Sequence, residues 1–576
     1  MQEPLPGATG IRAYHIRSKH FPRHYAAGPG YVDWETQPDP FRRHAGSPVV
    51  PLPLLADALQ TPFADVYRPA QVNPLPFDAA HVALLFELSL GLAAWKEYQG
   101  IRWALRCNPS SGNLHPTEGY AILPTLAATW PESPFTRQAT GPLTAGIYHY
   151  SSRDHILEAR LHLAELSDLL PKNTFLIGLS SIHWREAWKY GERSYRYCQL
   201  DVGHAVGALR YAAAALGWRV TVLLDPSDAD VTGLLGLNQN ALSGAEAEYP
   251  DLLLLVQTDA GVQTHMPRER LATMLKHCQP VDWLGRPNVL SQTHAHEWPA
   301  IDEAVAATIK PVTSEGLWHP EPLPDLRSSP DLQVLPATHP AATLIRHRRS
   351  GQTYDPRATL SRDAFFHMLD RLLPRNHTPP WDALPWHPGI HPVFFVHRVV
   401  GLEPGTYILV RHAESQPRLE AAMASEFGWE KPPGCPDHLS LFMLTECDMQ
   451  EQAKEVSCHQ EIAADGIFSL GMLADFAANL REGAWHYRRI FWEAGVLGHL
   501  LYLEAELLGL RGTGIGCFFD DHFHDFLGLE GDQFQSLYHF TVGKAIEDDR
   551  LVTLPAYSFQ KDAQESFTGE ARESFA

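Results

Sequence analysis

The sequence has no pair of cysteines at the spacing of a zinc ligand set or a redox motif. Its seven cysteines, at positions 107, 198, 278, 435, 447, 458 and 517, are scattered, and none belongs to a Cys-x-x-Cys pair. This pattern argues against both a zinc site and a disulfide framework. We interpret the cysteines as reduced thiols that are mostly buried.

Long apolar runs are also missing. No run reaches the roughly 18 residues that a membrane helix needs, and the start Met1-Gln2-Glu3-Pro4 lacks the basic and apolar regions of a signal peptide. We therefore expect a cytoplasmic protein without a membrane partner. Hydrophobic residues make up 44% and charged residues 20% of the 576 positions, which is typical of a soluble protein with more than one core.

Positive charge is scarce, since the formal net charge is −21. Such a chain repels phosphate backbones, so we expect no nucleic-acid partner. The 31 histidines include the close pairs His294/His296 and His522/His524, but neither pair has a third ligand at a recognisable spacing. We therefore predict no metal site.

Proline and apolar periodicity divide the chain. We predict an irregular N-terminal arm at 1–60, a first domain at 61–310, a proline-rich linker at 311–340, a second domain at 341–560 and a tail at 561–576. The linker has seven prolines, too many for a helix or a central strand. Predicted elements of the first domain are a helix starting near Phe77, strands at 119–124, 146–150, 175–181 and 252–256, and a long helix at 195–216. Those of the second are a helix at 361–373, strands at 393–399, 405–411, 439–445 and 537–542, and helices from 461 to 509.

The second half repeats the first. Adding 292 to each position from Tyr195 to Leu237 gives a plausible counterpart without a gap, for example Arg196 with Arg488 and Asp201 with Glu493. Elsewhere the offset changes to 285 or 276, as expected when loops differ in length. A repeat of about 250 residues indicates a duplicated domain.

Three motifs have the composition of a binding site. Pro109-Ser110-Ser111-Gly112-Asn113, followed by His115, offers hydroxyl, amide and backbone donors to a flat polar ligand. Arg348-Arg349-Ser350, followed by Gln352, suits a phosphate. Gly512-Thr513-Gly514-Ile515-Gly516 suits a closely packed ring. Taken singly, these stretches are also compatible with a solvated turn, an exposed basic helix start and a helix end with a tight turn.

In their order and spacing these motifs resemble the FMN-dependent nitroreductase superfamily, and more closely its azoline dehydrogenases of the SagB and ThcOx type, in tandem form. The resemblance covers most of residues 60 to 560. It implies an α+β fold: two nitroreductase-like domains, each a mainly antiparallel sheet flanked by helices, arranged as a homodimer fused into one chain. The long helices 195–216 and 487–509 would then face each other, and the protein would be a monomer with an internal pseudo-two-fold axis.

The resemblance also implies roles for single residues. Arg348, Arg349 and Ser350 would hold the FMN phosphate and ribityl end, Gln352 would lie near the flavin pyrimidine edge, and Gly512–Ile515 would pack on the ring face. Lys544 and Arg550 resemble the family's terminal phosphate contacts. The segment from Lys189 to Tyr197 resembles the one that carries the Lys-Tyr pair of azoline dehydrogenases, so Lys189 and Tyr190 are the predicted catalytic residues, with Arg193 and Arg196 lowering the pKa of Lys189. A positively charged helix start is the structural alternative for that segment.

We accordingly expect an FMN-dependent oxidoreductase that oxidises a small-molecule or peptide heterocycle. The alternatives are NAD(P)H-driven reduction of nitro compounds or quinones, and a scaffold that binds flavin or peptide without turnover. We also predict one FMN per chain. The first half keeps the serine loop, but 285 positions before Arg348-Arg349-Ser350 it has Phe63-Ala64-Asp65; the second half keeps the arginines, but its serine-loop counterpart is the bulky stretch 384–389.

Overall fold

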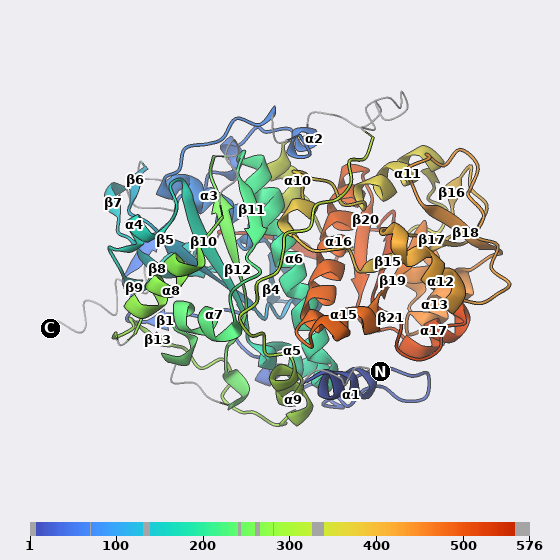
Figure 1. Ribbon diagram of the computed structural model, residues 1–576, viewed down its shortest axis with the longest axis horizontal. Coiled ribbons are helices and arrows are strands. Elements are labelled where there is room, and N and C mark those ends of the chain that lie inside the picture. The colour runs from blue at the N-terminus through green and yellow to red at the C-terminus, as the bar shows by residue number, and fades with distance from the viewer. Residues whose placement is uncertain are drawn as a thin grey trace.

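The computed structural model describes residues 7–68, 71–130, 139–239, 244–259, 265–279, 281–324 and 339–558. The first half, blue to green in Figure 1, and the second half, yellow to red, lie side by side with two long helices between them. One hydrophobic core cluster contains residues of both halves, such as Leu209 and Leu497. Two smaller clusters lie one in each half.

The first half is built on a seven-stranded sheet with the order β11-β12-β10-β5-β8-β9-β2. All of its pairings are antiparallel. The strands are β2 (Val49–Pro51), β5 (Thr117–Leu123), β8 (Gly146–Ser151), β9 (Ile156–His162), β10 (Thr174–Ser181), β11 (Arg219–Val222) and β12 (Tyr249–Gln257). The helices are α1 (Ala8–Arg17), α2 (Phe63–Val66), α3 (Ala79–Ser89), α4 (Leu166–Leu169), α5 (His183–Tyr190), α6 (Ser194–Ala215), α7 (Asp228–Leu235), α8 (Arg268–His277) and α9 (Pro299–Ala307).

The second half has a six-stranded sheet with the order β18-β17-β15-β19-β21-β20, again with antiparallel pairings throughout. The strands are β15 (Ile390–Val396), β17 (Gly405–Leu409), β18 (Leu441–Glu446), β19 (Phe468–Ala474), β20 (Arg511–Ile515) and β21 (Gln535–Gly543). The helices are α10 (Ala341–His347), α11 (Arg362–Arg371), α12 (Gln416–Ala422), α13 (Gln450–Val456), α14 (Glu461–Asp465), α15 (Phe476–Glu482), α16 (His486–Leu507) and α17 (Asp520–Leu527). The expected α+β class with antiparallel sheets is confirmed.

The two long helices pack against each other at the centre of the molecule, as predicted (Figure 1). Glycines allow the closest approach. A Cβ atom on Gly203 of α6 would lie 2.2 Å from the carbonyl oxygen of Trp492, and one on Gly495 of α16 would lie 2.2 Å from that of Leu200. The two positions are related by the offset of 292, so the crossing repeats the same contact on both sides of the pseudo-two-fold axis.

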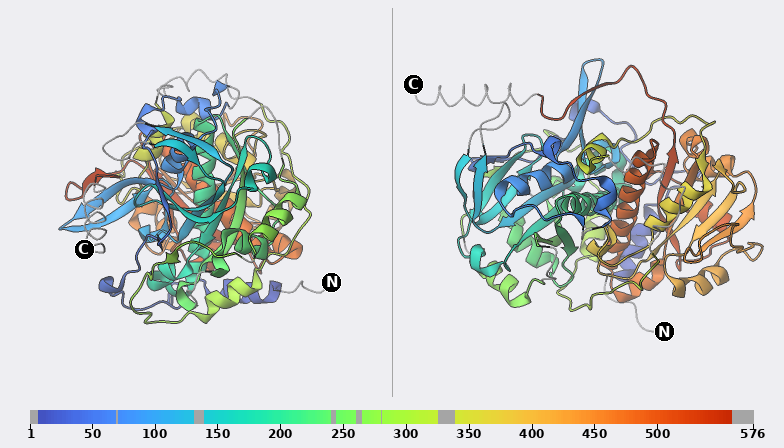
Figure 2. Two further views of the ribbon diagram at one scale, coloured as in Figure 1. Left: turned by 90° about the vertical axis from the view of Figure 1, so that its left-hand side faces the viewer. Right: turned by 90° about the horizontal axis from the view of Figure 1, so that it is seen from above.

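Short strands outside the two main sheets complete the fold. The pairs are β1 (His44–Ala45) with β13 (Arg286–Pro287), β6 (Leu126–Trp130) with β7 (Ala139–Leu143), and β14 (Leu360–Ser361) with β16 (Val399–Val400). A further three-stranded sheet joins β3 (Leu92–Tyr98) and β4 (Ile101–Arg106) with β22 (Val552–Pro555). The β3–β4 hairpin stands out from the body of the molecule (Figure 2), and β22 brings the end of the second half onto it.

Three sequence-based expectations about these elements are wrong. The arm is not wholly irregular, because α1 lies in it and β2 joins the first sheet. The stretch 461–509 is not helical throughout, because it contains β19, a strand whose seven residues are all buried. The hairpin β3–β4 was not anticipated. An apolar run buried on both faces has no alternation that separates a strand from a buried helix.

Near the linker, the sequence offset that relates equivalent positions of the two halves also differs from the predicted one. Pro62 forms an antiparallel bridge with Pro340, with the Phe63 amide donating to the His339 carbonyl and the Ala341 amide donating to the Thr61 carbonyl. This symmetric exchange corresponds to an offset of 278, not 285. The counterpart of Arg348 is then Ala70, which lies outside the described residues, and not Phe63.

Candidate functional site

A cavity of about 260 Å³ lies between the two halves. The first half contributes the β3–β4 hairpin, the loop 109–113 and two residues of α6. The second half contributes the segment 348–352, parts of α16, β20 and β21, and the segment before β22. The lining side chains used below are Lys96, Arg106, Ser110, Ser111, Asn113, Asp201, His204, Arg348, Arg349, Ser350, Tyr502 and Tyr538.

One end of the cavity is cationic. Arg348 is buried, donates to the carbonyl oxygen of Arg106 at 3.3 Å, and has its guanidinium carbon 4.9 Å from the centroid of the Tyr502 ring. Arg349 donates to two backbone carbonyls of its own segment. Within the described parts of the chain neither guanidinium forms an ion pair, and the buried Nε of Arg348 has no partner. Burial lowers the pKa of Arg349 to about 10, with a further contribution from Arg348.

The serine loop is held by a left-handed turn. Gly112 has a φ of 60° and Asn113 a φ of 57°, a region that glycine and asparagine tolerate best. The Ser110 hydroxyl accepts the His115 amide at 2.9 Å, and the Ser111 amide donates to Asp201 Oδ1 at 3.3 Å. The loop therefore presents its remaining polar groups to the cavity from a fixed backbone.

Two carboxyl groups lie beneath this loop. Asp201 lines the cavity, and its buried Oδ2 atom has no hydrogen-bond partner; burial raises the pKa of Asp201 to about 7. Burial, and then the charge of Asp201, raise the pKa of Glu186 on α5 well above its usual value. In the second half the counterpart Glu493 is instead paired with Arg411 and accepts the amides of Gly389 and Ile390.

Lys189 and Tyr190 lie against the outer side of Gly112. A Cβ atom at Gly112 would be 2.6 Å from the Tyr190 hydroxyl and 3.1 Å from Lys189 Nζ. Lys189 Nζ also lies 5.3 Å from the centroid of the Trp34 ring, so the N-terminal arm covers it. The structure thus brings the Lys-Tyr pair next to the serine loop.

The predicted cause of the Lys189 pKa shift is wrong. The pKa of Lys189 is lowered by burial, and Glu186 opposes that shift. Arg193 and Arg196 do not act on it, because both guanidiniums pair with the buried carboxylate of Asp520 at 2.8 and 2.6 Å.

Two glycines of the glycine motif, Gly514 and Gly516, line the cavity. The Gly514 amide donates to the Tyr502 hydroxyl at 3.0 Å, and a Cβ atom at Gly514 would lie 1.7 Å from the Tyr538 hydroxyl oxygen. The glycine thus makes room for tyrosines at the cavity wall. Thr513 donates to the Gly351 carbonyl at 2.7 Å, and Ile515 packs in the core of the second half.

Several predicted site residues lie at the margin or elsewhere. Gln352 is exposed at the cavity edge, and the Ser350 hydroxyl lies 2.9 Å from that of Tyr502. His115 is buried against the Ala104 carbonyl. Lys544 donates to the Gly509 carbonyl, and Arg550 pairs with Asp548, so neither cation joins the Arg348–Arg349 group.

Sequence reasoning missed a number of lining residues, among them Lys96, Arg106, His204, Tyr502 and Tyr538. Lys96 adds a third cation beside Arg349, and His204 Nε2 lies 3.1 Å from the Tyr538 hydroxyl. His204 Nδ1 and Arg106 Nε are buried without a partner. Three cations at one end and unpaired polar atoms along the wall fit a ligand with a phosphate and a polar heterocycle, such as FMN.

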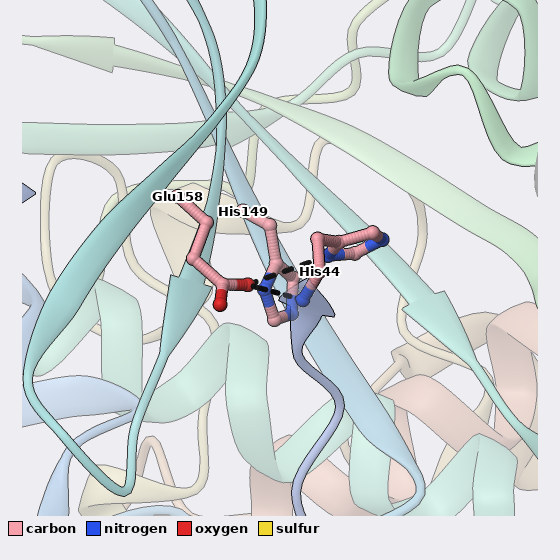
Figure 3. Close-up of side chains that lie close together, drawn as sticks. All are labelled: His44, His149 and Glu158. Atoms are coloured by element: carbon pink, nitrogen blue, oxygen red, sulfur yellow. Dashed lines mark hydrogen bonds and ion pairs between the residues drawn. The ribbon is translucent and has the colours of Figure 1, made fainter. Parts of the chain in front are cut away.

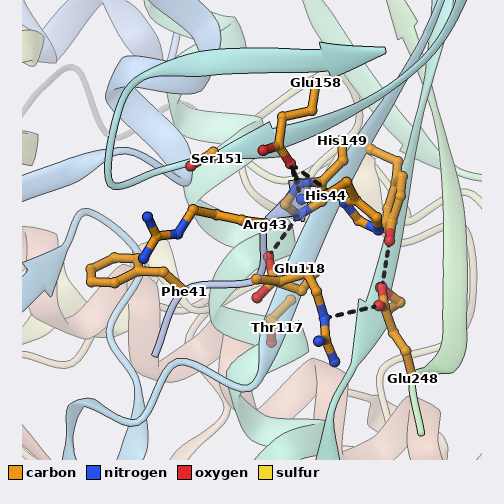
Figure 4. A network of polar contacts seen from close by, with 12 residues as sticks. Phe41, Arg43, His44, Thr117, Glu118, His149, Ser151, Glu158 and Glu248 are labelled. Carbon is orange, nitrogen blue, oxygen red and sulfur yellow. Dashed lines mark hydrogen bonds and ion pairs between the residues drawn. The ribbon is translucent and has the colours of Figure 1, made fainter. Parts of the chain in front are cut away.

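A separate buried cluster in the first half comprises His44, His149 and Glu158 (Figure 3). It is the one group in the described chain whose ligand atoms lie close enough together for a metal ion. His149 Nδ1 faces Glu158 at 2.9 Å and Nε2 faces Glu118 at 3.0 Å (Figure 4). Glu118 also accepts from Arg185. Both ring nitrogens therefore donate to carboxylates, and the two glutamates raise the pKa of His149 to about 9 against the effect of burial. We interpret the cluster as a buried ion network.

Across the described residues, no helix is long and apolar enough to span a bilayer.

Comparison with known proteins finds one family match and several similar structures. Residues 345–544 match the nitroreductase family. A stretch of 143 residues, 23% of the chain, is 30% identical to the trifolitoxin-processing protein TfxB of Rhizobium leguminosarum bv. trifolii, of which it covers 35%. The chain thus spans about a third of that relative's length.

Among solved structures, a nitroreductase-like protein from Anabaena variabilis aligns with 93% of this chain and 99% of its own, with a TM-score of 0.63 and 20% identity. An E. coli microcin synthetase complex matches 41% of this chain and 79% of its own at 14% identity, with a TM-score of 0.26 that is too low to bear on the argument. The Anabaena structure extends the shared fold over both halves. Residues 345–544 therefore form a nitroreductase-family domain, and both halves of the chain share the fold of the Anabaena protein.

Proposed function

We propose that the protein is an FMN-dependent oxidoreductase of the SagB and ThcOx type that oxidises a small-molecule or peptide heterocycle. The observation that carries the proposal is the assembly of one cavity from two halves. The second half supplies Arg348 and Arg349, which form no ion pair among the described residues, and the first half supplies the serine loop with Lys189 and Tyr190 behind it.

Arg348, Arg349 and Lys96 would hold the phosphate. Their charges are not neutralised by any carboxylate ion pair in the described residues, so a dianion would gain charge-assisted hydrogen bonds there. Ser110, Ser111 and Asn113 would bond the polar edge of the ring. A bound flavin supplies the redox chemistry, because it accepts a hydride from carbon and passes two electrons to an acceptor.

Lys189 would take the proton that leaves the substrate together with the hydride. A general base must be neutral to accept a proton, and burial already lowers the pKa of this lysine. Tyr190 and Trp34 flank the ammonium group and fix its position. The corresponding residues in the second half are Arg481 and Glu482, which cannot repeat this chemistry.

One FMN per chain is part of the proposal, because the counterpart region is filled by protein. The position equivalent to Tyr502 is Arg210, whose guanidinium donates to both carboxylate oxygens of Asp382 at 2.7 and 2.9 Å. Nearby, the buried Tyr67 hydroxyl lies 2.9 Å from that of Tyr211 and donates to Glu504. These side chains are buried and mutually satisfied, so opening the space for a second flavin would break several hydrogen bonds.

The nature of the substrate is proposed from the relative. TfxB is named for trifolitoxin processing, and by that likeness the substrate here would be a heterocycle within a modified peptide. An azoline oxidised to an azole loses one hydride and one proton, which matches a flavin and a neighbouring base.

The test is anaerobic reduction of the flavin-loaded protein. A synthetic thiazoline peptide should bleach the absorbance of oxidised flavin at about 450 nm and yield the thiazole, whereas NADH or NADPH alone should bleach it much more slowly. Fast bleaching by NADH with no reaction of any thiazoline would replace the proposal with a nitro or quinone reductase. A purified protein that neither contains nor takes up flavin would rule out both.

A further inference from the structure

Two cysteines that are distant in the sequence lie together beside the cavity wall. The Sγ atoms of Cys458 and Cys517 are 2.8 Å apart, although 59 positions separate the residues. Cys458 follows α13, and Cys517 follows Gly516, which lines the cavity. Both are partly exposed, and of the seven cysteines only Cys107, Cys198 and Cys278 are buried. The expectation that most of the cysteines are buried is therefore wrong.

The surroundings of the pair favour thiol chemistry. A hydrogen bond from the Cys458 thiol lowers the pKa of Cys517, burial opposes that shift, and the Arg193 guanidinium adds to it. Arg193 Nε also donates to the Gly516 carbonyl at 3.2 Å, so the cation is fixed next to Cys517. A partly exposed thiol with a lowered pKa beside a cation is the kind of cysteine that reacts with disulfides. Cys458 lies in a left-handed turn with a φ of 55°, which aims its side chain at Cys517.

We propose that Cys458 and Cys517 form a redox-active pair that closes reversibly to a disulfide by exchange with a low-molecular-weight disulfide. The Cys517 thiolate attacks one sulfur of the small disulfide and releases one small thiol. The Cys458 thiol then loses its proton to solvent, displaces the second small thiol from Cys517 and completes the intramolecular bond. Two protein thiols are oxidised, one small disulfide is reduced to two thiols, and no other oxidant is needed.

Because of the position of the pair, a disulfide between Cys458 and Cys517 would constrain the cavity wall. It would tie the turn after α13 to the segment after β20, and thus fix the stretch that carries Gly514 and Gly516 at the cavity wall. Transient disulfides in reducing compartments are typically catalytic or redox-sensing. This inference goes beyond the proposed function and does not depend on flavin, because it concerns the protein thiols alone.

The experiment compares the full chain after incubation with oxidised glutathione or with dithiothreitol. Small molecules are removed, the protein is unfolded in excess N-ethylmaleimide, and the adducts are counted by intact mass. The oxidised wild type should carry two fewer adducts than the reduced one, without a bound glutathione, and peptide mapping should recover a fragment that joins Cys458 to Cys517. Dithiothreitol should restore both adducts.

Three variants make the result specific. Cys458→Ser and Cys517→Ser should each lose the linked fragment, and Cys458→Ser should retain glutathione on Cys517 as the trapped mixed disulfide. Cys447→Ser, which removes the exposed cysteine, should behave as the wild type does. Equal adduct numbers in the two states, a link between other cysteines, or glutathione only on Cys447 would overturn the proposal. Because the readout is covalent mass, failure of the flavin assay would leave it standing.

Discussion

Lys189 is the side chain whose replacement separates chemistry from binding. It is partly buried between Trp34 and Tyr190, and it contacts the loop at Gly112 rather than the cationic end of the cavity. Lys189→Ala should leave FMN binding intact and slow flavin reduction by a thiazoline peptide about 100-fold, the scale of a lost general base. Stopped-flow absorbance under anaerobic conditions measures the rate.

Lys189→Arg provides the matched control for that prediction. Arginine keeps the positive charge between the two aromatic rings but does not deprotonate in a protein. Flavin reduction in Lys189→Arg should therefore be as slow as in Lys189→Ala if Lys189 acts as a base. Near wild-type rates for the arginine variant would show that only the charge matters and would remove the base from the mechanism.

Arg348 should dominate the affinity for the phosphate. The buried guanidinium has an unpartnered Nε and no ion pair among the described residues. Arg348→Ala should weaken FMN binding at least tenfold, since a hydrogen bond to a charged group contributes about 1.5–3 kcal/mol. Fluorescence quenching of free FMN on titration with apoprotein measures this affinity.

Arg357→Ala is the control for the phosphate site. Arg357 lies in the same segment but is exposed and paired with Asp355 at 3.0 Å. Its removal should leave the FMN affinity unchanged. An equal loss of affinity in the two variants would show that general positive charge, not the Arg348 site, attracts the phosphate.

The sequence predicted the site residues that belong to short motifs better than those that are scattered along the chain. The serine loop and Arg348–Ser350 are short motifs, and they meet at the cavity. Lys96, Tyr502 and Tyr538 come from elements with no motif of their own, so only the fold brings them there. Lys544 donates to the Gly509 carbonyl and Arg550 pairs with Asp548, contacts that the sequence alone did not reveal.

The crossing of α6 and α16 is the element on which the arrangement of the halves depends. A methyl group at Gly203 or Gly495 would meet a backbone carbonyl at 2.2 Å, and backbone atoms of a packed helix pair cannot move independently. Gly203→Ala and Gly495→Ala should each lower the free energy of unfolding by about 1–3 kcal/mol, the scale of overpacking in a core. Urea unfolding followed by tryptophan fluorescence measures this change.

Gly141→Ala in β7 is the neutral comparison, because a Cβ atom added at this glycine would have no other atom within 4 Å. It should unfold as the wild type does. If the variants at the helix crossing were as stable as this control, the close contact between the halves would be wrong.

The ion network across β5, β8 and β9 should make stability depend on pH. The glutamates raise the folded-state pKa of His149 to about 9, above its unfolded value of 6.5, so its contribution is complete below pH 6.5 and is lost as the pH rises through 9. His44 has its pKa lowered to about 4 and Glu158 to about 2, so neither titrates in that window. Burial opposes but does not outweigh the effect of Arg185 and His149, which hold the pKa of Glu118 well below its usual value, so Glu118 also stays charged in that window.

His149→Gln should therefore be less stable than the wild type by about 3 kcal/mol or more at about pH 6, the scale of breaking a buried pair. The difference in the free energy of unfolding between His149→Gln and the wild type should shrink between pH 6.5 and pH 9. Urea unfolding at a series of pH values measures this difference. His319→Gln, at an exposed position, should match the wild type throughout. A difference that grew with pH would contradict the charged state of His149.

Elements with clear periodicity were predicted, and those defined by tertiary context were not. The helices α6 and α16 and the strand β12 lie within a few residues of their predicted bounds. Strand β19 was predicted as part of a helix because all seven of its residues are apolar or small and buried. Strand β22 pairs with β3 from near the opposite end of the chain, which no local pattern reveals.

At the scale of the whole molecule, equivalent positions in the two halves have different partners. Asp201 and Glu493 occupy equivalent positions, yet Asp201 lines the cavity with an unpartnered oxygen while Glu493 is neutralised by Arg411. Tyr502 forms part of the cavity wall, while its equivalent Arg210 is bound to Asp382. These differences are the basis for proposing one flavin site per chain, at the cavity that Asp201 and Tyr502 line.

The ratio of flavin to protein is the most direct test of a single site shared by the two halves. The purified chain is saturated with FMN, freed of excess ligand and heated, and the released flavin is counted by absorbance against the protein concentration. We expect a ratio close to one per chain. A ratio near two would mean that the region around Tyr67 and Arg210 opens to a second flavin, and would contradict the assignment of a single shared site.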